Sequence, residues 1–265
     1  MLFSYGAFVA APASAEGIVW RLENPFRLFT EPALTERHRE IGDGLSTGER
    51  LSPVLSTERR LAALEPWGWA ADAVGGTCWD AKSNSYAACG GLDAYINPKS
   101  HAVLVRAPGI APVGAPCIFT LTVTAASGPP RQSIKDGPCD FDQRFEIPFP
   151  DGAELRVEAP GAPAQLATIR VRDIFIVGLG DSFGSGEGNP DRPVAFSTER
   201  EADYGLGPDK VELAGYPARV GAWDAIGDKT FLDNGPVWWS QACHRSLYSH
   251  QLRAALQLAL DDPRR

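Results

Sequence analysis

Residues 173–189 read DIFIVGLGDSFGSGEGN, and this stretch decides how the last third of the chain is interpreted. Its first part, Ile174–Val177, is a continuous apolar run, which is typical of a strand buried on both faces in a parallel sheet. The glycine-rich part that follows carries Ser182. Open α/β sheets bind their ligands beyond the carboxyl ends of their strands. The stretch therefore predicts an α/β domain that presents Ser182 at the edge of its sheet.

An amphipathic helix is predicted near the C-terminus. Ser246 or Ser249 can cap its beginning, and Pro263 ends it. Its apolar face carries Leu252, Leu256 and Leu260. One strand and one helix do not complete a parallel sheet, and the alternating pattern of the preceding residues argues against their supplying the missing strands. We therefore expect residues 173–265 to be the N-terminal part of a longer α/β domain, and the chain to be a fragment.

A different pattern, with a hydrophobic period of two, marks residues 97–172. Short alternating segments are separated by turns rich in proline and glycine. These predicted strands cover residues 102–105, 117–124, 141–147, 153–157 and 165–171. Several short strands at this spacing predict an all-β, immunoglobulin-like sandwich, which beside an enzyme serves as a structural or binding module.

The preceding residues, 16–96, are predicted to form an irregular and helical N-terminal region. Ser52 and Pro53 begin a helix, because proline suits the first helical position, and Pro66 ends it. The aromatic segment Trp20–Phe29 is interrupted by Pro25 and is expected to be an irregular arm.

The first fifteen residues match the pattern of a secretory signal peptide. They carry no charge, and Ala13-Ser14-Ala15 has the form of a cleavage site. A positive charge at the beginning is missing, and a buried N-terminal strand is the alternative interpretation. No other apolar run approaches the roughly 20 residues that cross a bilayer. We expect a secreted or periplasmic protein without a membrane span.

The cysteines support export. Cys78 and Cys89 flank one short segment, and Cys117 and Cys139 flank another, so both pairs are candidate disulfides. No spacing is C-x-x-C, which argues against a zinc ribbon. Cys243 is left over and predicts a partner cysteine outside this sequence.

The composition is that of a folded protein of about two domains: 265 residues, 44% of them hydrophobic and 22% charged. The net charge is −8, and Lys and Arg form no sustained block. A nucleic-acid partner is not expected, because such proteins carry a basic patch or stripe. The oligomeric state is left open.

Ser182 is the candidate nucleophile. The flanking glycines, Gly184 among them, allow a sharp turn and bring backbone N–H groups close to a developing oxyanion. Asp181 can hold this turn through bonds from its side chain to the backbone. Serine is a poor nucleophile until a neighbouring base takes its proton, so a histidine is required as well.

Two segments resemble the GDSL, or SGNH, hydrolase family. Gly180–Phe183 (GDSF) resembles its first block, and Gly180–Gly188 (GDSFGSGEG) is similar to the version in secreted bacterial members. Trp239–Ser246 (WSQACHRS) strengthens the likeness, since a C-H-R-S element before a helix recurs in those members. The resemblance covers about residues 173–265 and does not reach the first two thirds of the chain.

This resemblance implies a three-layer, flavodoxin-like domain that hydrolyses carboxylic esters without a metal or an organic cofactor. Ser182 would be the nucleophile and, with Gly184, would form the oxyanion and turn element. Asp181, Glu187 and His244 would support the loop. The substrate would be a small-molecule, polysaccharide or lipid ester, including sugar acetates and thioesters.

The chain departs from the family in two blocks. It contains no G-x-N-D and no D-x-x-H, so the catalytic base is missing and we expect this chain to be inactive alone. His244 is not expected to serve as the base for Ser182, nor to pair with Cys243 in thiol catalysis. It is expected to hydrogen-bond near the loop.

Other interpretations fit the loop less well. A G-x-S-x-G nucleophile elbow must run straight into a helix, which Gly186, Gly188, Pro190 and Pro193 disfavour. The loop lacks residues that the dinucleotide-binding and P-loop motifs require. Its carboxylates do not have the spacing of a calcium-binding EF-hand loop. An ordinary turn serine is the non-catalytic interpretation of Ser182. A non-enzymatic adhesion or carbohydrate-binding sandwich is the alternative for the whole protein.

Overall fold

The computed structural model describes residues 17–65, 67–124, 129–196, 232–262 and 264. The chain divides into two compact units, each described here by itself. Of the described residues, the β unit comprises 17–23 and those within 99–172, and the helical unit comprises those within 24–98 and 173–262. The helical unit is thus formed by two segments distant in sequence: the one between β1 and β2, and the one after β7 that carries Ser182. The predicted signal peptide lies outside the described residues.

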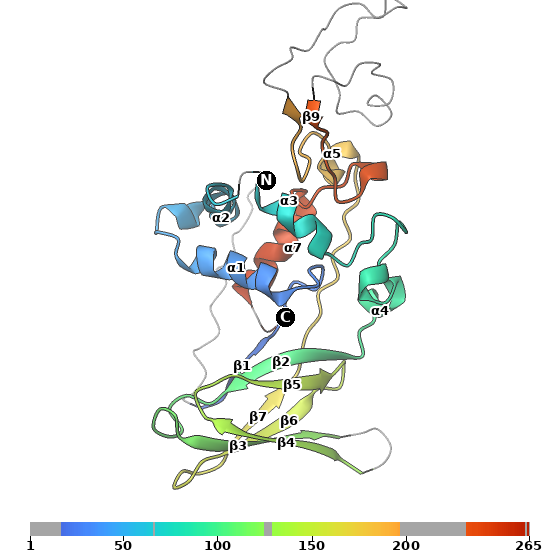
Figure 1. Ribbon diagram of the computed structural model, residues 1–265. Coiled ribbons are helices and arrows are strands. Elements are labelled where there is room, and N and C mark those ends of the chain that lie inside the picture. Colours follow the sequence, from blue (N-terminus) through green and yellow to red (C-terminus); the bar gives the residue numbers. More distant parts are fainter. Residues whose placement is uncertain (1–16, 66, 125–128, 197–231, 263, 265) are drawn as a thin grey trace, which may run out of the picture. The chain divides into compact units, whose positions relative to one another are not determined.

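Two antiparallel sheets make up the β unit (Figure 1). The three-stranded sheet has the order β1–β2–β5, and the four-stranded sheet has the order β4–β3–β6–β7. The strands are β1 (Val19–Leu22), β2 (Ser100–Arg106), β3 (Pro116–Val123), β4 (Arg131–Pro138), β5 (Gln143–Pro148), β6 (Ala153–Glu158) and β7 (Gln165–Ile169).

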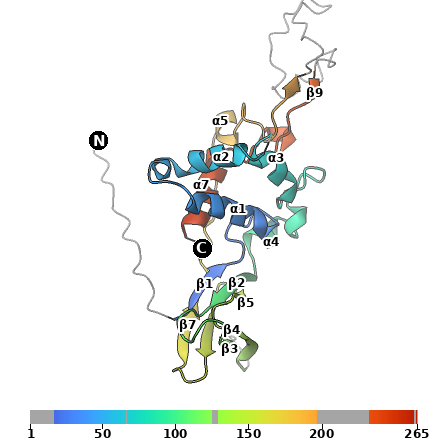
Figure 2. The same cartoon turned by 60° about the vertical axis from the view of Figure 1, so that its left-hand side comes forward.

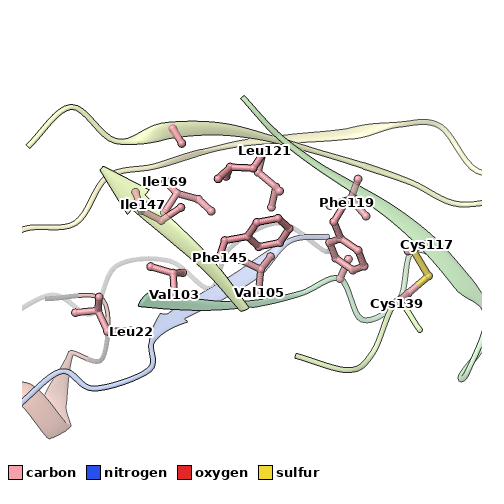
Figure 3. Close-up of a cluster of buried hydrophobic side chains, with 14 of the residues drawn as sticks. Leu22, Val103, Val105, Cys117, Phe119, Leu121, Cys139, Phe145, Ile147 and Ile169 are labelled. Atoms are coloured by element: carbon pink, nitrogen blue, oxygen red, sulfur yellow. A yellow bond between two sulfur atoms is a disulfide. The ribbon is translucent and has the colours of Figure 1, made fainter. Parts of the chain in front are cut away.

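The core of the β unit lies between these sheets. Alternate side chains of the strands are buried, as the period of two predicts: on β2, Val103 and Val105 are inaccessible while their neighbours are partly exposed. Figure 3 shows Val105 and Phe145 of one sheet directed toward Phe119 and Leu121 of the other. One buried cluster therefore holds the two sheets together.

Five of the seven strands of this unit were predicted from the sequence, and two were not. The predicted ranges match β2, β3, β5, β6 and β7 to within a few residues. β4 lacks the alternation because most of its side chains are exposed at the sheet edge. The expectation of an irregular arm over Trp20–Phe29 is wrong at its start, because Val19–Leu22 pairs with β2.

The helical unit contains longer and shorter helices. The α-helices are α1 (Pro32–Asp43), α2 (Pro53–Ala62), α3 (Trp69–Ala73), α4 (Leu92–Ile96), α5 (Ser182–Ser185) and α7 (His250–Asp261). The 3-10 helices are η1 (Glu49–Leu51), η2 (Val74–Gly76), η3 (Ala87–Cys89) and η4 (Gln241–Cys243). Strands β8 (Ala195–Phe196) and β9 (Leu232–Asn234) form a short antiparallel pair. None of the helices described here is long and apolar enough to cross a membrane.

Aromatic packing forms the core of this unit. Figures 1 and 2 both show α7 lying among α1, α2 and α3. Trp69 of α3 makes edge contacts with Phe29 and with His38 of α1, at centroid distances of 6.3 and 4.6 Å. Leu61 of α2 and Leu256 of α7 are buried in the same cluster. The long helices therefore share one core.

Both sequence-predicted helices are confirmed. α2 begins at Pro53 directly after Ser52, although the Ser52 side chain makes no capping bond, and it ends before Pro66. Ser249 is the residue that precedes α7, and Leu256 is buried on its apolar face. The spacing of apolar residues and the residues that start and stop a helix were sufficient to predict both helices, because each helix is amphipathic.

The expected buried parallel strand is not present in the part of the chain described. Residues 170–180 belong to no helix or strand, and the four side chains of Ile174–Val177 are 39–67% exposed. The prediction of a strand buried on both faces is therefore wrong for this chain. The physical reason is that no described strand lies beside this run to accept its backbone hydrogen bonds, since β8 pairs only with β9.

Two disulfides confirm the cysteine analysis. Cys78–Cys89 lies in the helical unit, and Cys117–Cys139 links β3 to the residue after β4. Both cysteines of the second pair are 1% exposed and belong to the sandwich core. Cys243 is an exposed free thiol.

Replacing Cys117 and Cys139 together by alanine should lower the free energy of unfolding of the β unit by about 3 kcal/mol, because the unfolded chain regains the freedom of the closed loop. Hydrogen exchange of the β3 and β6 amides as a function of urea concentration measures the change, because these amides report the β unit alone. Cys243→Ser is the matched control and should leave the midpoint unaltered. A double variant as stable as the wild type would contradict the prediction.

Candidate active site around Ser182

Ser182 is the first residue of the single-turn helix α5. The carboxylate of Asp181 accepts hydrogen bonds from the backbone N–H groups of Phe183 (3.0 Å) and Gly184 (3.4 Å), which is the N-cap arrangement. Gly186 ends the turn in the left-handed region, at φ 90°, where a side chain would be strained. Asp181 therefore holds the turn as the sequence predicted.

The hydroxyl of Ser182 is accessible. The residue is exposed, and within the part of the chain described its Oγ and its backbone N–H make no hydrogen bond. Its carbonyl, by contrast, accepts bonds from the Ser185 hydroxyl (2.7 Å) and the Glu187 N–H (2.9 Å). The backbone of the turn is thus fixed, while the Ser182 hydroxyl is left accessible.

Ser182 lines an open cavity of about 770 Å³ within the helical unit. The turn and Ser246 form one part of its wall, and the exposed run Ile174–Val177 together with α7 forms another. Tyr86, Tyr95 and Trp239 add aromatic surface. The lining is therefore mixed: apolar and aromatic surface makes up the larger part, and polar side chains such as Ser182, Arg245 and Gln251 make up the rest.

Arg27 provides a cation at the aromatic part of the wall. Its guanidinium lies 2.6 Å from a carboxylate oxygen of Asp173 and 5.4 Å above the ring of Tyr95. Tyr95 stacks on Tyr86 with centroids 4.8 Å apart, and burial raises the pKa of Tyr95 to about 12. Both tyrosines are therefore neutral hydrogen-bonding groups at physiological pH, and Arg27 is partly neutralised by Asp173.

Asp191 connects the Ser182 loop to the segment before α7. Its carboxylate is inaccessible and accepts hydrogen bonds from Leu247 N–H (2.7 Å), from the Ser246 hydroxyl (3.1 Å) and from Trp239 N–H. Burial raises the pKa of Asp191 to about 6, against the opposing effect of these three donors. The three bonds tie the chain near residue 191 to residues 239–247.

Ser246 continues this connection to the turn. Its backbone N–H donates to the carbonyl of Ser185 (3.0 Å), the last residue of α5. A Cβ added at Gly186 would lie only 3.1 Å from the Ser246 Cβ, so the two segments are closely packed. Figures 1 and 2 show α5 beside the segment that contains η4.

His244 lies close to the loop but makes no hydrogen bond to Ser182. Its ring stacks on Trp238, with centroids 4.6 Å apart and planes 7° from parallel. Its Nδ1 lies 3.7 Å from Glu187 Oε1, an ion-pair distance rather than a hydrogen bond. The structure thus brings Glu187 and His244 close together. The hydrogen bond expected of His244 is not found at Nδ1, which is buried without a hydrogen-bond partner among the described residues.

Gly184 plays a more limited role than expected. Its N–H points to the Asp181 carboxylate, so this donor is already used within the turn. A side chain here would also approach Gln251 of α7, since an added Cβ would lie 3.4 Å from its Nε2. Gly184 therefore serves the turn and its packing.

The described carboxylates do not assemble a metal site. No group of three or more His, Cys, Asp or Glu residues in the described ranges is arranged to hold a metal ion. Asp181 and Asp191 are committed to backbone and hydroxyl donors instead.

Sequence reasoning missed Asp191 and Ser246 as site residues. From the sequence, Asp191 is one more carboxylate of the loop without EF-hand spacing, and Ser246 is a helix cap or part of the C-H-R-S element. The N-P-D run after the glycines was the available signal, but nothing local to it predicts a buried carboxylate with partners some fifty residues later.

Comparisons with known proteins do not add to this description. No family model matches the sequence, and no curated protein or solved structure matches it either.

The buried carboxylate gives a pH dependence of stability. Because the folded-state pKa of Asp191, about 6, lies above its ordinary value of 3.8, the folded chain keeps the proton where the unfolded chain has lost it. Relative to Asp191→Asn, the wild type should therefore gain stability as the pH falls from 7 to 4, by at most about 3 kcal/mol. Urea denaturation at several pH values measures this difference, and equal pH profiles for both proteins would refute it.

Proposed function

We propose that this chain carries the nucleophile of a serine hydrolase that acts on carboxylic esters and resembles the GDSL, or SGNH, family. The observation that carries the proposal is the accessible Ser182 hydroxyl at the start of an Asp181-capped turn, in the wall of a cavity. An ordinary turn serine would need no adjoining cavity of this size. In the described part of the chain no parallel sheet lies next to Ser182, so the proposal does not rest on the sheet that the sequence predicted.

In the proposed reaction, Ser182 Oγ attacks the carbonyl carbon of the ester while a base removes the hydroxyl proton. The bond to the alcohol oxygen then breaks, the alcohol leaves with a proton, and water releases the acid from the acyl-enzyme. The unused backbone N–H of Ser182 is a donor for the oxyanion that forms. The base that removes this proton would come from a D-x-x-H motif in the family, and this sequence contains none.

The cavity indicates which esters would fit. Its aromatic and aliphatic lining favours a substrate with an apolar or ring-containing part, and a small-molecule, polysaccharide or lipid ester meets this requirement. The proposed activity needs no metal or organic cofactor, because the hydroxyl and backbone donors supply the chemistry.

The two disulfides support an oxidising compartment, so we place the protein outside the cytoplasm, secreted or periplasmic. The two antiparallel sheets of the β unit fit the proposal of an immunoglobulin-like accessory module. If Ser182 proves unreactive, an adhesion or carbohydrate-binding role for this sandwich becomes the preferred interpretation.

An added base should activate Ser182. We expect the 265-residue chain to react slowly with an alkyl fluorophosphonate in buffer alone, and about tenfold faster at Ser182 with imidazole present, because imidazole can take the hydroxyl proton that the chain leaves in place. The Oγ–P bond forms, fluoride leaves, and imidazole carries the proton away. Site-resolved mass spectrometry measures the modified fraction.

Ser83 is the matched reference, since it is an exposed serine of the same unit whose hydroxyl bonds to Asp80. Ser182→Ala must abolish the imidazole-dependent labelling. Labelling of Ser182 no faster than labelling of Ser83, with imidazole present, would overturn the proposed function.

A further inference from the structure

Asp191 is the one Asp, Glu, Lys or Arg residue that is fully buried among the residues described. Burying a carboxylate is costly unless it is paired or fully hydrogen-bonded. Within the described ranges no salt bridge to Asp191 is found. Its partners are instead two backbone N–H groups and one hydroxyl, on Trp239, Leu247 and Ser246. A charged group retained at such a place has an effect that a neutral side chain would not reproduce.

The three donors explain why a carboxylate is required. The backbone N–H groups of Leu247 and Trp239 can only donate, and they face different oxygens, so both oxygens of the ionised Asp191 accept. An asparagine has one acceptor oxygen, and its NH₂ group would face a donor. Asparagine can therefore satisfy Ser246 and Leu247, which share one oxygen, but not Trp239 N–H at the other.

The contacts form a continuous path from Asp191 to Ser182. Asp191 fixes the hydroxyl of Ser246, and the N–H of Ser246 holds the Ser185 carbonyl. Ser185 in turn bonds twice within the turn, from its N–H to the Asp181 carbonyl (3.1 Å) and from its hydroxyl to the Ser182 carbonyl. α5 is a single turn, so a displacement at Ser185 is transmitted to Ser182.

We propose that Asp191 is a positioning residue for Ser182 and acts through Ser246, an inference that rests on the proposed function of Ser182. Asp191 is not among the residues that line the cavity. It orients the Ser182 turn by holding residues 239–247 against it.

Hydrogen exchange tests the path without requiring any activity. In Asp191→Ala the amide of Ser246, which bonds Ser185, and that of Glu187, which bonds Ser182, should exchange about tenfold faster. The amide of Cys78, bonded to the Leu28 carbonyl at 2.8 Å in the same unit, should change by less than about twofold. Asp191→Asn should give intermediate exchange, because it restores two of the three bonds.

The reactivity of Ser182 supplies the second measurement. With imidazole present, labelling by the fluorophosphonate should fall about tenfold in Asp191→Ala and recover in part in Asp191→Asn. Asp80→Ala is the matched control: Asp80 also accepts from a backbone N–H, on Lys82, and from a serine hydroxyl, on Ser83. This variant should label Ser182 at the wild-type rate.

The outcomes separate the two proposals. Unreactive Ser182 in the wild type defeats the proposed function, while the exchange of Ser246 and Glu187 still decides whether Asp191 orders the turn. Unchanged exchange at these two amides in both Asp191 variants overturns the positioning role. Equal acceleration at Cys78 in Asp191→Asn also overturns it, since that result describes general destabilisation.

Discussion

The carboxylate of Asp191 is the interaction on which the candidate site depends. It collects donors from a segment about fifty residues away in sequence and fixes that segment beside the Ser182 turn. The turn itself is short, and its internal hydrogen bonds involve only Asp181 and the residues up to Glu187. A four-residue helix has little stability of its own, so its position must come from what packs against it. The buried charge supplies that position at a cost to stability near neutral pH.

In the rest of the helical unit, too, contacts between segments distant in sequence hold the structure together. Its core contains aromatic rings that meet edge to face, such as Trp69 with Phe29 and with His38. α7 contributes Leu256 to this core and Gln251 to the neighbourhood of Gly184. The helix that completes the core thus also borders the candidate site, which connects stability of the unit to the geometry around Ser182.

The features that could be predicted from the sequence are those whose signal lies within the element itself. Features that depend on contacts between residues distant in sequence could not be predicted. The period of two found most strands of the β unit, and helical spacing found α7, because each pattern reports the burial of that element alone. β4 was not predicted, because most of its side chains are exposed and its sequence therefore lacks the alternation of apolar and polar residues. Asp181 was predicted as the cap because its partners lie two and three residues away. Asp191 could not be found in this way, since its partners are distant in sequence.

The exposed run Ile174–Val177 affects how the protein associates with other chains in solution. Four consecutive residues with a high preference for strands are uncovered, uncharged, and free of proline. A strip of this kind favours intermolecular cross-β contact, and it is the sort of surface that holdase chaperones engage. This short apolar segment therefore offers other chains a surface for association, alongside the net negative charge that opposes it.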